Sequence, residues 1–196
     1  MNTSNKMKMK LETTCKIALA LLAYSLPIVL YAAAPKVGDK APDFALMTLD
    51  DQTVRLSDMT ATGKVVLIVL RGWPGYQCPI CTRQVQDYIA STSDFAIAKA
   101  RVVMVYPGPA EDLKAHAEDF LKNKQWPREF VFLTDPNFTM VNTYGLRWGA
   151  PSETAYPSTF LVDPKGIVRF AKISRSHGDR TKATDVVQEL KREDSD

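Results

Sequence analysis

Runs of apolar residues alternate with amphipathic stretches along most of the chain. Continuous runs rich in β-branched residues and leucine predict strands that are buried on both faces, at residues 64–70, 101–106 and 130–133. Apolar positions spaced three or four residues apart follow two of these runs and predict helices over about residues 79–90 and 110–124. Strands and helices in alternation favour an α/β fold with a central sheet flanked by helices.

The last third of the chain has the pattern strand, turn, strand and helix. Residues 159–162 and 167–171 flank residues 163–166, whose sequence Asp-Pro-Lys-Gly is typical of a tight turn, so the two strands are expected to pair antiparallel. A closing helix is predicted over residues 182–191, and a short helix over residues 135–144. A hairpin beside strands that are joined by helices makes the predicted sheet mixed.

The first 34 residues differ from the rest. Four lysines up to Lys16 precede the uncharged apolar residues 17–34, which is the layout of a secretory signal. This stretch is also close to the roughly 20 residues that span a bilayer. Residues 1–34 are therefore predicted to be a signal peptide or an N-terminal membrane anchor, attached through residues 17–34. Either alternative implies an exported protein, in the periplasm or elsewhere in the cell envelope.

Residues 35–196 are predicted to form one domain, which begins with a β-hairpin of residues 44–49 and 53–56 around a polar turn. The whole chain carries a net charge of +3, and residues 1–34 account for it with four lysines and one glutamate. The predicted domain is therefore electrically neutral. A neutral domain lacks the basic surface that nucleic acids require, so no nucleic-acid partner is expected.

The motif Cys78-Pro79-Ile80-Cys81 lies where the strand over residues 64–70 gives way to a helix. Residues 71–75 contain two glycines and a proline, which end the strand and place Cys78 at the helix N-terminus. There the free N–H groups and the helix dipole favour a thiolate. Cys81 follows after almost one helical turn, within reach of a disulfide.

The spacing of Cys81 relative to Val85, Tyr88 and Ile89 places it on the inward face of the helix and leaves Cys78 nearer to solvent. This asymmetry suits dithiol exchange, because the exposed thiol forms a mixed disulfide and the shielded thiol releases it. We therefore predict that Cys78 is the nucleophile, that Cys81 is the resolving thiol, and that the two form a disulfide.

Two alternatives assign the cysteines a structural role. A disulfide across so small a loop would remove little entropy from the unfolded chain. Half of a zinc site would need a second Cys-x-x-C or a spaced Cys/His pair, and the sequence has neither. Redox chemistry is the favoured interpretation. It requires no metal and no organic cofactor, because the sulfur pair itself holds the electrons.

The order of the predicted elements resembles the thioredoxin fold, and three segments narrow the resemblance. They are similar to the alkyl hydroperoxide reductase and thiol-specific antioxidant (AhpC/TSA) family, and comprise residues 37–44 (Val-Gly-Asp-Lys-Ala-Pro-Asp-Phe), Thr134-Asp135-Pro136 with Tyr144-Gly145, and residues 158–166. Leu70-Arg71-Gly72 before the cysteine motif is most similar to the peroxiredoxin-like members. The resemblance covers about residues 36–190. It implies a thiol oxidoreductase with antioxidant activity and a thiol reductant as partner.

Two departures from the family separate the possible substrates. Typical peroxiredoxins carry a Pro and a Thr or Ser before the reactive cysteine, where this chain has Arg71 and Gly75. Tyr156-Pro157-Ser158 resembles instead the cis-proline loop of thioredoxins. A cis bond at Pro157 would leave the preceding backbone free to pair with a bound peptide, so Pro157 is predicted to shape a substrate groove. Peroxide and protein disulfide both remain open as substrates.

Some side chains near the motif have two interpretations. Trp73 and Tyr76 either wall the entrance of the groove to Cys78 or pack over the edge of the sheet. A positive neighbour of the thiolate could come from one of three arginines that are more often solvated, namely Arg71, Arg83 and Arg147. The two histidines, His116 and His177, are expected to be solvated.

A rival function is copper delivery by a binding protein of the thioredoxin fold. Copper chaperones of the cytochrome oxidase assembly type are similar in fold, compartment and leader. They place three residues between the cysteines and a His shortly before the strand that corresponds to residues 159–162. This chain has two residues between its cysteines, and Ala155 and Tyr156 stand near the second position, so copper delivery is disfavoured.

Overall fold

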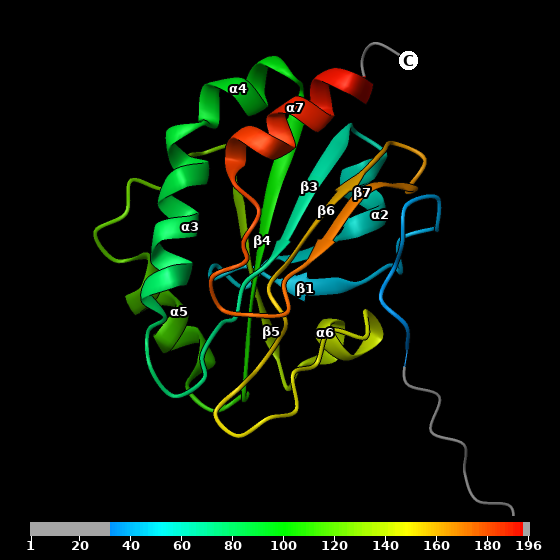
Figure 1. Ribbon diagram of the computed structural model, residues 1–196. Coiled ribbons are helices and arrows are strands. Elements are labelled where there is room, and N and C mark those ends of the chain that lie inside the picture. The colour runs from blue at the N-terminus through cyan, green and yellow to red at the C-terminus, as the bar shows by residue number, and fades with distance from the viewer. Residues whose placement is uncertain (1–31, 194–196) are drawn as a thin grey trace, which may run out of the picture. The chain divides into compact units, whose positions relative to one another are not determined.

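A seven-stranded mixed sheet runs through the computed structural model, which describes residues 32–193 (Figure 1). The strand order is β2-β1-β5-β4-β3-β6-β7. The strands are β1 (Ala45–Met47), β2 (Thr53–Arg55), β3 (Lys64–Val69), β4 (Ala100–Gly108), β5 (Val131–Pro136), β6 (Ser158–Val162) and β7 (Val168–Ile173). The helices are α2 (Leu56–Thr60), α3 (Pro79–Ala90), α4 (Thr92–Ile97), α5 (Leu113–Leu121), α6 (Thr139–Thr143) and α7 (Ala183–Glu193).

The pairing confirms the predicted α/β class, the mixed sheet and both hairpins. Strands β3, β4 and β5 are parallel neighbours, while β1 with β2 and β6 with β7 form antiparallel hairpins. Strand β6 pairs antiparallel with β3 and so joins the second hairpin to the parallel strands. This places β3, which leads into the cysteine motif, in the interior of the sheet.

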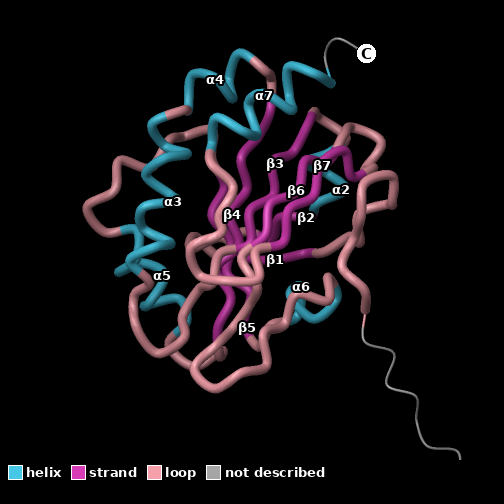
Figure 2. Tube along the Cα trace, viewed as in Figure 1, coloured by secondary structure: helices cyan, strands magenta, loops and turns pink. Residues whose placement is uncertain are grey.

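Alternate residues of β3, and Leu70 directly after it, contribute to two separate cores. Val66, Ile68 and Leu70 pack with α3, α4, α5 and α7 on one face of the sheet. Val65 and Leu67 pack with α2 and α6 on the other. Figures 1 and 2 show these two layers of helices on either side of the strands. A strand covered on both faces explains the continuous apolar run in the sequence.

Several element boundaries differ from the sequence prediction. Asp135 and Pro136, expected to start the short helix, belong to β5, and α6 starts at Thr139. Helix α3 ends at Ala90 as predicted, but a second helix, α4, which the sequence analysis did not predict, begins at Thr92 and buries Phe95 against Tyr88 with their ring centroids 5.6 Å apart. Burial of that aromatic ring outweighs the weak helix propensity of Ser and Thr. Strand β4 extends through Pro107 and Gly108, which pair in register with β5. Helix α5 is shorter than the predicted span of residues 110–124.

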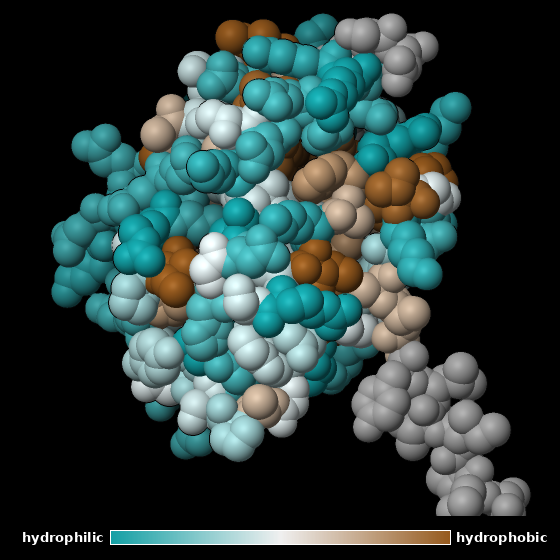
Figure 3. Space-filling view, viewed as in Figure 1, coloured by the Kyte–Doolittle hydropathy of each residue, from teal (hydrophilic) through white to brown (hydrophobic). Residues whose placement is uncertain are grey.

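Most of the surface seen in Figure 3 is hydrophilic, with small separate apolar patches. Four large apolar side chains are exposed among the described residues, namely Val37, Met47, Tyr76 and Ile97. Between residues 32 and 193 there is no helix long and apolar enough to cross a membrane. The predicted signal or anchor over residues 1–34 lies almost entirely outside the described residues, and it stays a prediction.

Candidate active site

The segment between β3 and α3 is fixed to the neighbouring strand β4. Leu70 N–H donates to the Val105 carbonyl oxygen at 2.9 Å, and Trp73 N–H donates to the Pro107 carbonyl oxygen at 2.9 Å. Gly72 between them has φ +74°, and a Cβ atom there would collide with the Pro107 carbonyl group. Glycine is therefore needed for the chain to leave the sheet at this point and deliver Cys78 to the helix.

Cys78 is the N-cap residue of α3, as the sequence predicts, and Pro79 is the first residue of the helix. The Cys78 sulfur accepts a hydrogen bond from Cys81 N–H at 3.4 Å. Both cysteines are free thiols. The expected difference in exposure is small, because Cys78 is only 2% exposed and Cys81 is fully buried. A substrate must therefore reach a sulfur that lies just beneath the surface.

The environment separates the pKa values of the two thiols. A hydrogen bond from the Cys81 thiol lowers the pKa of Cys78 to about 5 against the opposing effect of burial, and Cys81 N–H and the Arg180 charge assist. Burial raises the pKa of Cys81 well above its ordinary value, and its hydrogen bond to Cys78 adds to the effect. At neutral pH Cys78 therefore carries the negative charge and Cys81 carries the proton.

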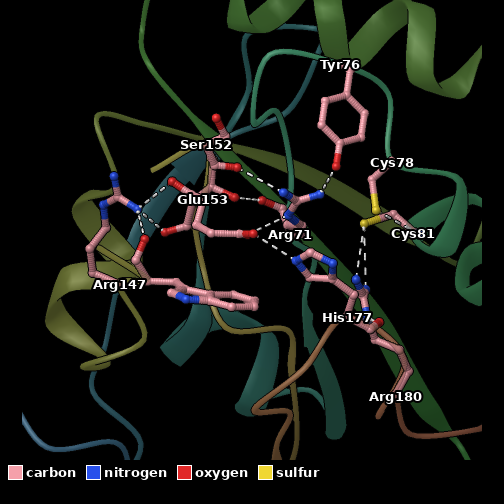
Figure 4. A network of polar contacts seen from close by, with 11 residues as sticks. Arg71, Tyr76, Cys78, Cys81, Arg147, Ser152, Glu153, His177 and Arg180 are labelled. Atoms are coloured by element: carbon pink, nitrogen blue, oxygen red, sulfur yellow. Dashed lines mark hydrogen bonds and ion pairs between the residues drawn. The ribbon is translucent and has the colours of Figure 1, made fainter. Parts of the chain in front are cut away.

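The positive neighbour of the sulfur pair is Arg180, which the sequence analysis did not single out (Figure 4). Its Nη1 and Nη2 atoms lie 3.6 and 3.7 Å from the Cys81 sulfur. Nη1 also donates to Gln84 Oε1 at 2.7 Å, and Nε donates to the His177 carbonyl oxygen at 2.9 Å. Arg180 lies 99 positions after Cys81, in the segment before α7, so no local pattern indicates the contact.

The three arginines named from the sequence occupy other environments. Arg83 is exposed on α3, and Arg147 donates to backbone carbonyl groups that include that of Trp148 at 2.7 Å. Arg71 is 3% exposed, so the expectation of a solvated charge is wrong for it. Its Nε donates to Glu153 Oε2 at 2.7 Å, and a cation at the end of a buried strand requires such a partner.

Glu153 joins two parts of the site. Its Oε2 atom accepts from Arg71, and its Oε1 atom lies 2.8 Å from His177 Nε2 (Figure 4). His177 is thus within hydrogen-bond distance of a carboxylate and only partly exposed, although the sequence analysis expected it to be solvated. The backbone carbonyl of His177 in turn holds Arg180. The polar contacts therefore run without a break from Arg71 to the Cys81 sulfur.

The two aromatic residues of the predicted entrance behave differently. Trp73 stacks on His116 of α5 with ring centroids 3.6 Å apart, which is packing against a helix. His116 is consequently not a simple solvated side chain. Tyr76 is 47% exposed, and its hydroxyl accepts a hydrogen bond from Arg71 Nη1. Of the two, Tyr76 is thus the candidate for contact with a substrate near Cys78.

Gln77 precedes the reactive cysteine and was overlooked in the sequence analysis. Its Oε1 atom accepts from the Tyr106 hydroxyl of β4 at 2.9 Å, and its Nε2 atom donates to the His116 carbonyl oxygen at 2.8 Å. The amide thereby fixes the residue before Cys78 to both β4 and α5. A polar residue next to a cysteine motif is the only hint that the sequence offers.

The structure contradicts the predicted cis bond before Pro157, because no peptide bond in residues 32–193 is cis. The neighbouring backbone is also not free. Tyr156 N–H donates to the Leu146 carbonyl oxygen at 2.9 Å, and the Tyr156 carbonyl accepts from Ser158 Oγ at 2.8 Å. The segment that contains Leu146 therefore occupies the edge to which a peptide was expected to bind. Pro157 loses the support for its predicted role in a substrate groove.

A thioredoxin-like sheet that presents a Cys-x-x-C pair at a helix N-terminus is typical of the class of thiol oxidoreductases. Residues 37–171 match the model of the AhpC/TSA family, and the chain belongs to this family. It is accordingly an enzyme of the peroxiredoxin and thiol oxidoreductase type. Within residues 32–193, no three His, Cys, Asp or Glu side chains are grouped so that they could hold a metal ion.

The relatives of this chain include both peroxiredoxins and thiol:disulfide interchange proteins. Peroxiredoxin Bcp of Bacillus subtilis is 29% identical over 136 residues, which cover 67% of this chain and 80% of that protein. Thiol:disulfide interchange protein DsbE of Xylella fastidiosa is 31% identical over 138 residues, which cover 68% of this chain and 59% of that protein. The crystal structure of peroxidoxin BcpB from Mycobacterium tuberculosis has a TM-score of 0.63 at 23% identity, covering 81% and 97% of the two chains.

Proposed function

We propose that this chain reduces an oxidised substrate by cycling Cys78 and Cys81 between a dithiol and a disulfide. The observation that carries the proposal is the division of charge within the pair. Cys78 is held as a thiolate at the start of α3, and the protonated thiol of Cys81 lies behind it, hydrogen-bonded to it. A nucleophile and a resolving thiol need this arrangement, because the thiolate is the form that attacks.

A small hydroperoxide is the oxidant that the site accommodates best. Cys78 is 2% exposed, and the backbone near Pro157 that would pair with a peptide is already hydrogen-bonded to the protein itself. Attack by the thiolate forms a sulfur–oxygen bond and breaks the peroxide bond, and the leaving oxygen takes up a proton and departs as water or an alcohol. Cys81 then attacks the Cys78 sulfenic acid, forming the disulfide and releasing water. A thiol reductant restores both thiols by exchange.

A protein disulfide is the second candidate substrate. Gly75 stands where a hydroxyl residue would help to orient a peroxide, and a Cβ atom at Gly75 would meet no heavy atom within 4 Å. No side chain therefore fills the position next to Gly75. The resemblance to a thiol:disulfide interchange protein agrees with this alternative.

We further propose that residues 1–34 direct export. The proposal rests on the lysines that precede the apolar residues 17–34. N-terminal sequencing of the protein recovered from the cell envelope would distinguish a cleaved signal from a retained anchor. Recovery of the intact chain in the cytoplasm would exclude both.

The test of the cysteine roles uses the full chain with Cys15→Ser, so that Cys78 and Cys81 are the only thiols that can react. Reduced protein is mixed with hydrogen peroxide and, separately, with a peptide disulfide, and tryptophan fluorescence follows both reactions. Cys78→Ser should abolish turnover with either oxidant. Cys81→Ser should still react once and leave a sulfenic acid or a mixed disulfide on Cys78. Normal turnover of Cys81→Ser with a dithiol reductant would show that Cys81 is not the resolving residue.

A further inference from the structure

The guanidinium of Arg180 is aimed at the resolving sulfur. Both of its terminal nitrogens lie within 3.7 Å of the Cys81 sulfur (Figure 4). Its other side-chain partners are the Gln84 amide oxygen and the His177 carbonyl oxygen, which are neutral. Within the described residues no carboxylate pairs with it. The positive charge of Arg180 is therefore directed to a sulfur atom.

This position is fixed before any reaction begins. Gln84, which is itself buried, lies one turn along α3 from Cys81 and holds Nη1 at 2.7 Å. On the other side, the His177 carbonyl oxygen holds Nε, and Glu153 holds the His177 ring. A cation that is already oriented costs no reorganisation when negative charge develops next to it.

The resolving step needs help that the resting site does not otherwise supply. Burial raises the pKa of Cys81, so in the resting enzyme this thiol keeps its proton and donates it to the Cys78 thiolate. Once Cys78 has bonded to a substrate sulfur or oxygen, its negative charge is gone. Burial also raises the pKa of the nearby Tyr106, whose hydroxyl stays neutral. Arg180 is then the cation in contact with the sulfur that must ionise.

We propose that Arg180 is a catalytic residue of the resolving half-reaction, in which its guanidinium stabilises the Cys81 thiolate. This inference rests on the dithiol cycle proposed above. In the step, Cys81 gives its proton to solvent and attacks the Cys78 sulfur, and a sulfur–sulfur bond forms between the cysteines. If Cys78 carries a substrate sulfur, that sulfur–sulfur bond breaks and the substrate leaves as a thiolate, which takes up a proton. If Cys78 is a sulfenic acid, its sulfur–oxygen bond breaks and the oxygen takes up a proton and leaves as water.

The two half-reactions should depend on Arg180 to different extents. Cys78 has a pKa of about 5, so it stays ionised at neutral pH even if loss of Arg180 raises that value modestly. Cys81 has a raised pKa, and therefore its reactive fraction follows any further rise directly. Removal of the charge should slow the second step selectively.

The experiment uses dithiobis(nitrobenzoate), a small aromatic disulfide that releases a coloured thiolate in each half-reaction. The reduced full chain with Cys15→Ser should give two phases, the first from attack by Cys78 and the second from resolution by Cys81. Arg180→Gln should change the first phase less than about twofold and slow the second about three- to tenfold, since the lost thiolate is partly offset by its higher nucleophilicity. Arg180→Lys keeps the charge and should recover part of the second rate.

Arg83→Gln is the matched control, because it removes an exposed charge from the same helix. It should leave both phases unchanged. Raising the pH should restore the second phase of Arg180→Gln, whereas damage to the fold would not respond in this way. An unaltered second phase in Arg180→Gln, or equal slowing of both phases, overturns the role of Arg180. A wild type that shows no second phase overturns the dithiol cycle itself.

Discussion

Arg71 and Arg180 are both held by the polar network beside the cysteines, yet they are bonded in opposite ways. Arg71 is almost completely buried, and its partners are the Glu153 carboxylate, the Ser152 carbonyl oxygen and the Tyr76 hydroxyl. Arg180 is half-buried, and it contacts only neutral oxygen atoms and a sulfur. One guanidinium has a counter-ion, and the other has a thiol.

The difference shows how one residue type serves structure in one place and chemistry in another. Although burial disfavours the cation, the hydrogen bonds to Tyr76 and Glu153 raise the pKa of Arg71 above its usual range. Its charge is cancelled by Glu153, so Arg71 holds the end of β3 to the segment around residue 153. Arg180 has no such counter-ion and contributes to the lowered pKa of Cys78. The nature of the partner, not burial alone, determines which cation can act on the sulfur atoms.

The largest expected effect that separates the two arginines is on stability. Arg71→Met leaves the largely covered Glu153 carboxylate with His177 as its remaining side-chain partner and should lower the free energy of unfolding by about 2–4 kcal/mol. Arg180→Met loses hydrogen bonds from a half-buried side chain and should cost about 1–2 kcal/mol. Urea unfolding of the reduced full chain measures both. Equal losses would show that Arg180 is as much a structural residue as Arg71 and would remove the contrast.

Glu153→Gln changes the residue that links Arg71 to His177, whose backbone carbonyl in turn holds Arg180. It should have a smaller effect, a loss of about 1–3 kcal/mol in the free energy of unfolding. Burial opposes ionisation of Glu153, but hydrogen bonds from Arg71 and His177 lower its pKa below the ordinary 4.5. The folded state thus favours the carboxylate. Its contribution is fully present above the ordinary carboxyl pKa and is lost as the pH falls through the lowered value.

The pH dependence supplies the control for that variant. Wild type and Glu153→Gln should differ most at neutral pH and should converge in acid, once the pH is below the lowered pKa of Glu153, because both then carry an uncharged side chain at residue 153. Urea midpoints measured at both pH values test this. A difference that persists unchanged in acid would mean that the amide disturbs packing and not charge.

Local physics made one half of the site predictable. The apolar run of β3, the breaking residues after it and the cysteine spacing each act over a few positions, so the sequence alone placed Cys78 at a helix N-terminus with Cys81 inward. The same holds for the hairpin of β6 and β7, which is set by its turn residues. The helix α4 was missed because burial of Phe95, a tertiary effect, decides it.

The other half of the site depends on contacts between distant segments. Arg180 and Glu153 come from segments without regular periodicity, and their partners lie 99 and 82 positions away, at Cys81 and Arg71. The Pro157 prediction failed for the same reason. A short motif suggests a free backbone edge, but it contains no information about Leu146, which occupies that edge.

The smallest expected effect concerns Tyr76, the exposed residue that is hydrogen-bonded to Arg71. Tyr76→Phe removes the hydroxyl that accepts from Arg71 Nη1 and should cost less than about 1 kcal/mol, since at 47% exposure water can replace the lost acceptor. The ring is retained, so the rate of attack by Cys78 on the aromatic disulfide should stay within about twofold. Tyr76→Ala should instead speed that attack if the ring walls the approach to Cys78. No change in Tyr76→Ala would assign Tyr76 to the support of Arg71 alone and would leave the entrance to Cys78 without an aromatic wall.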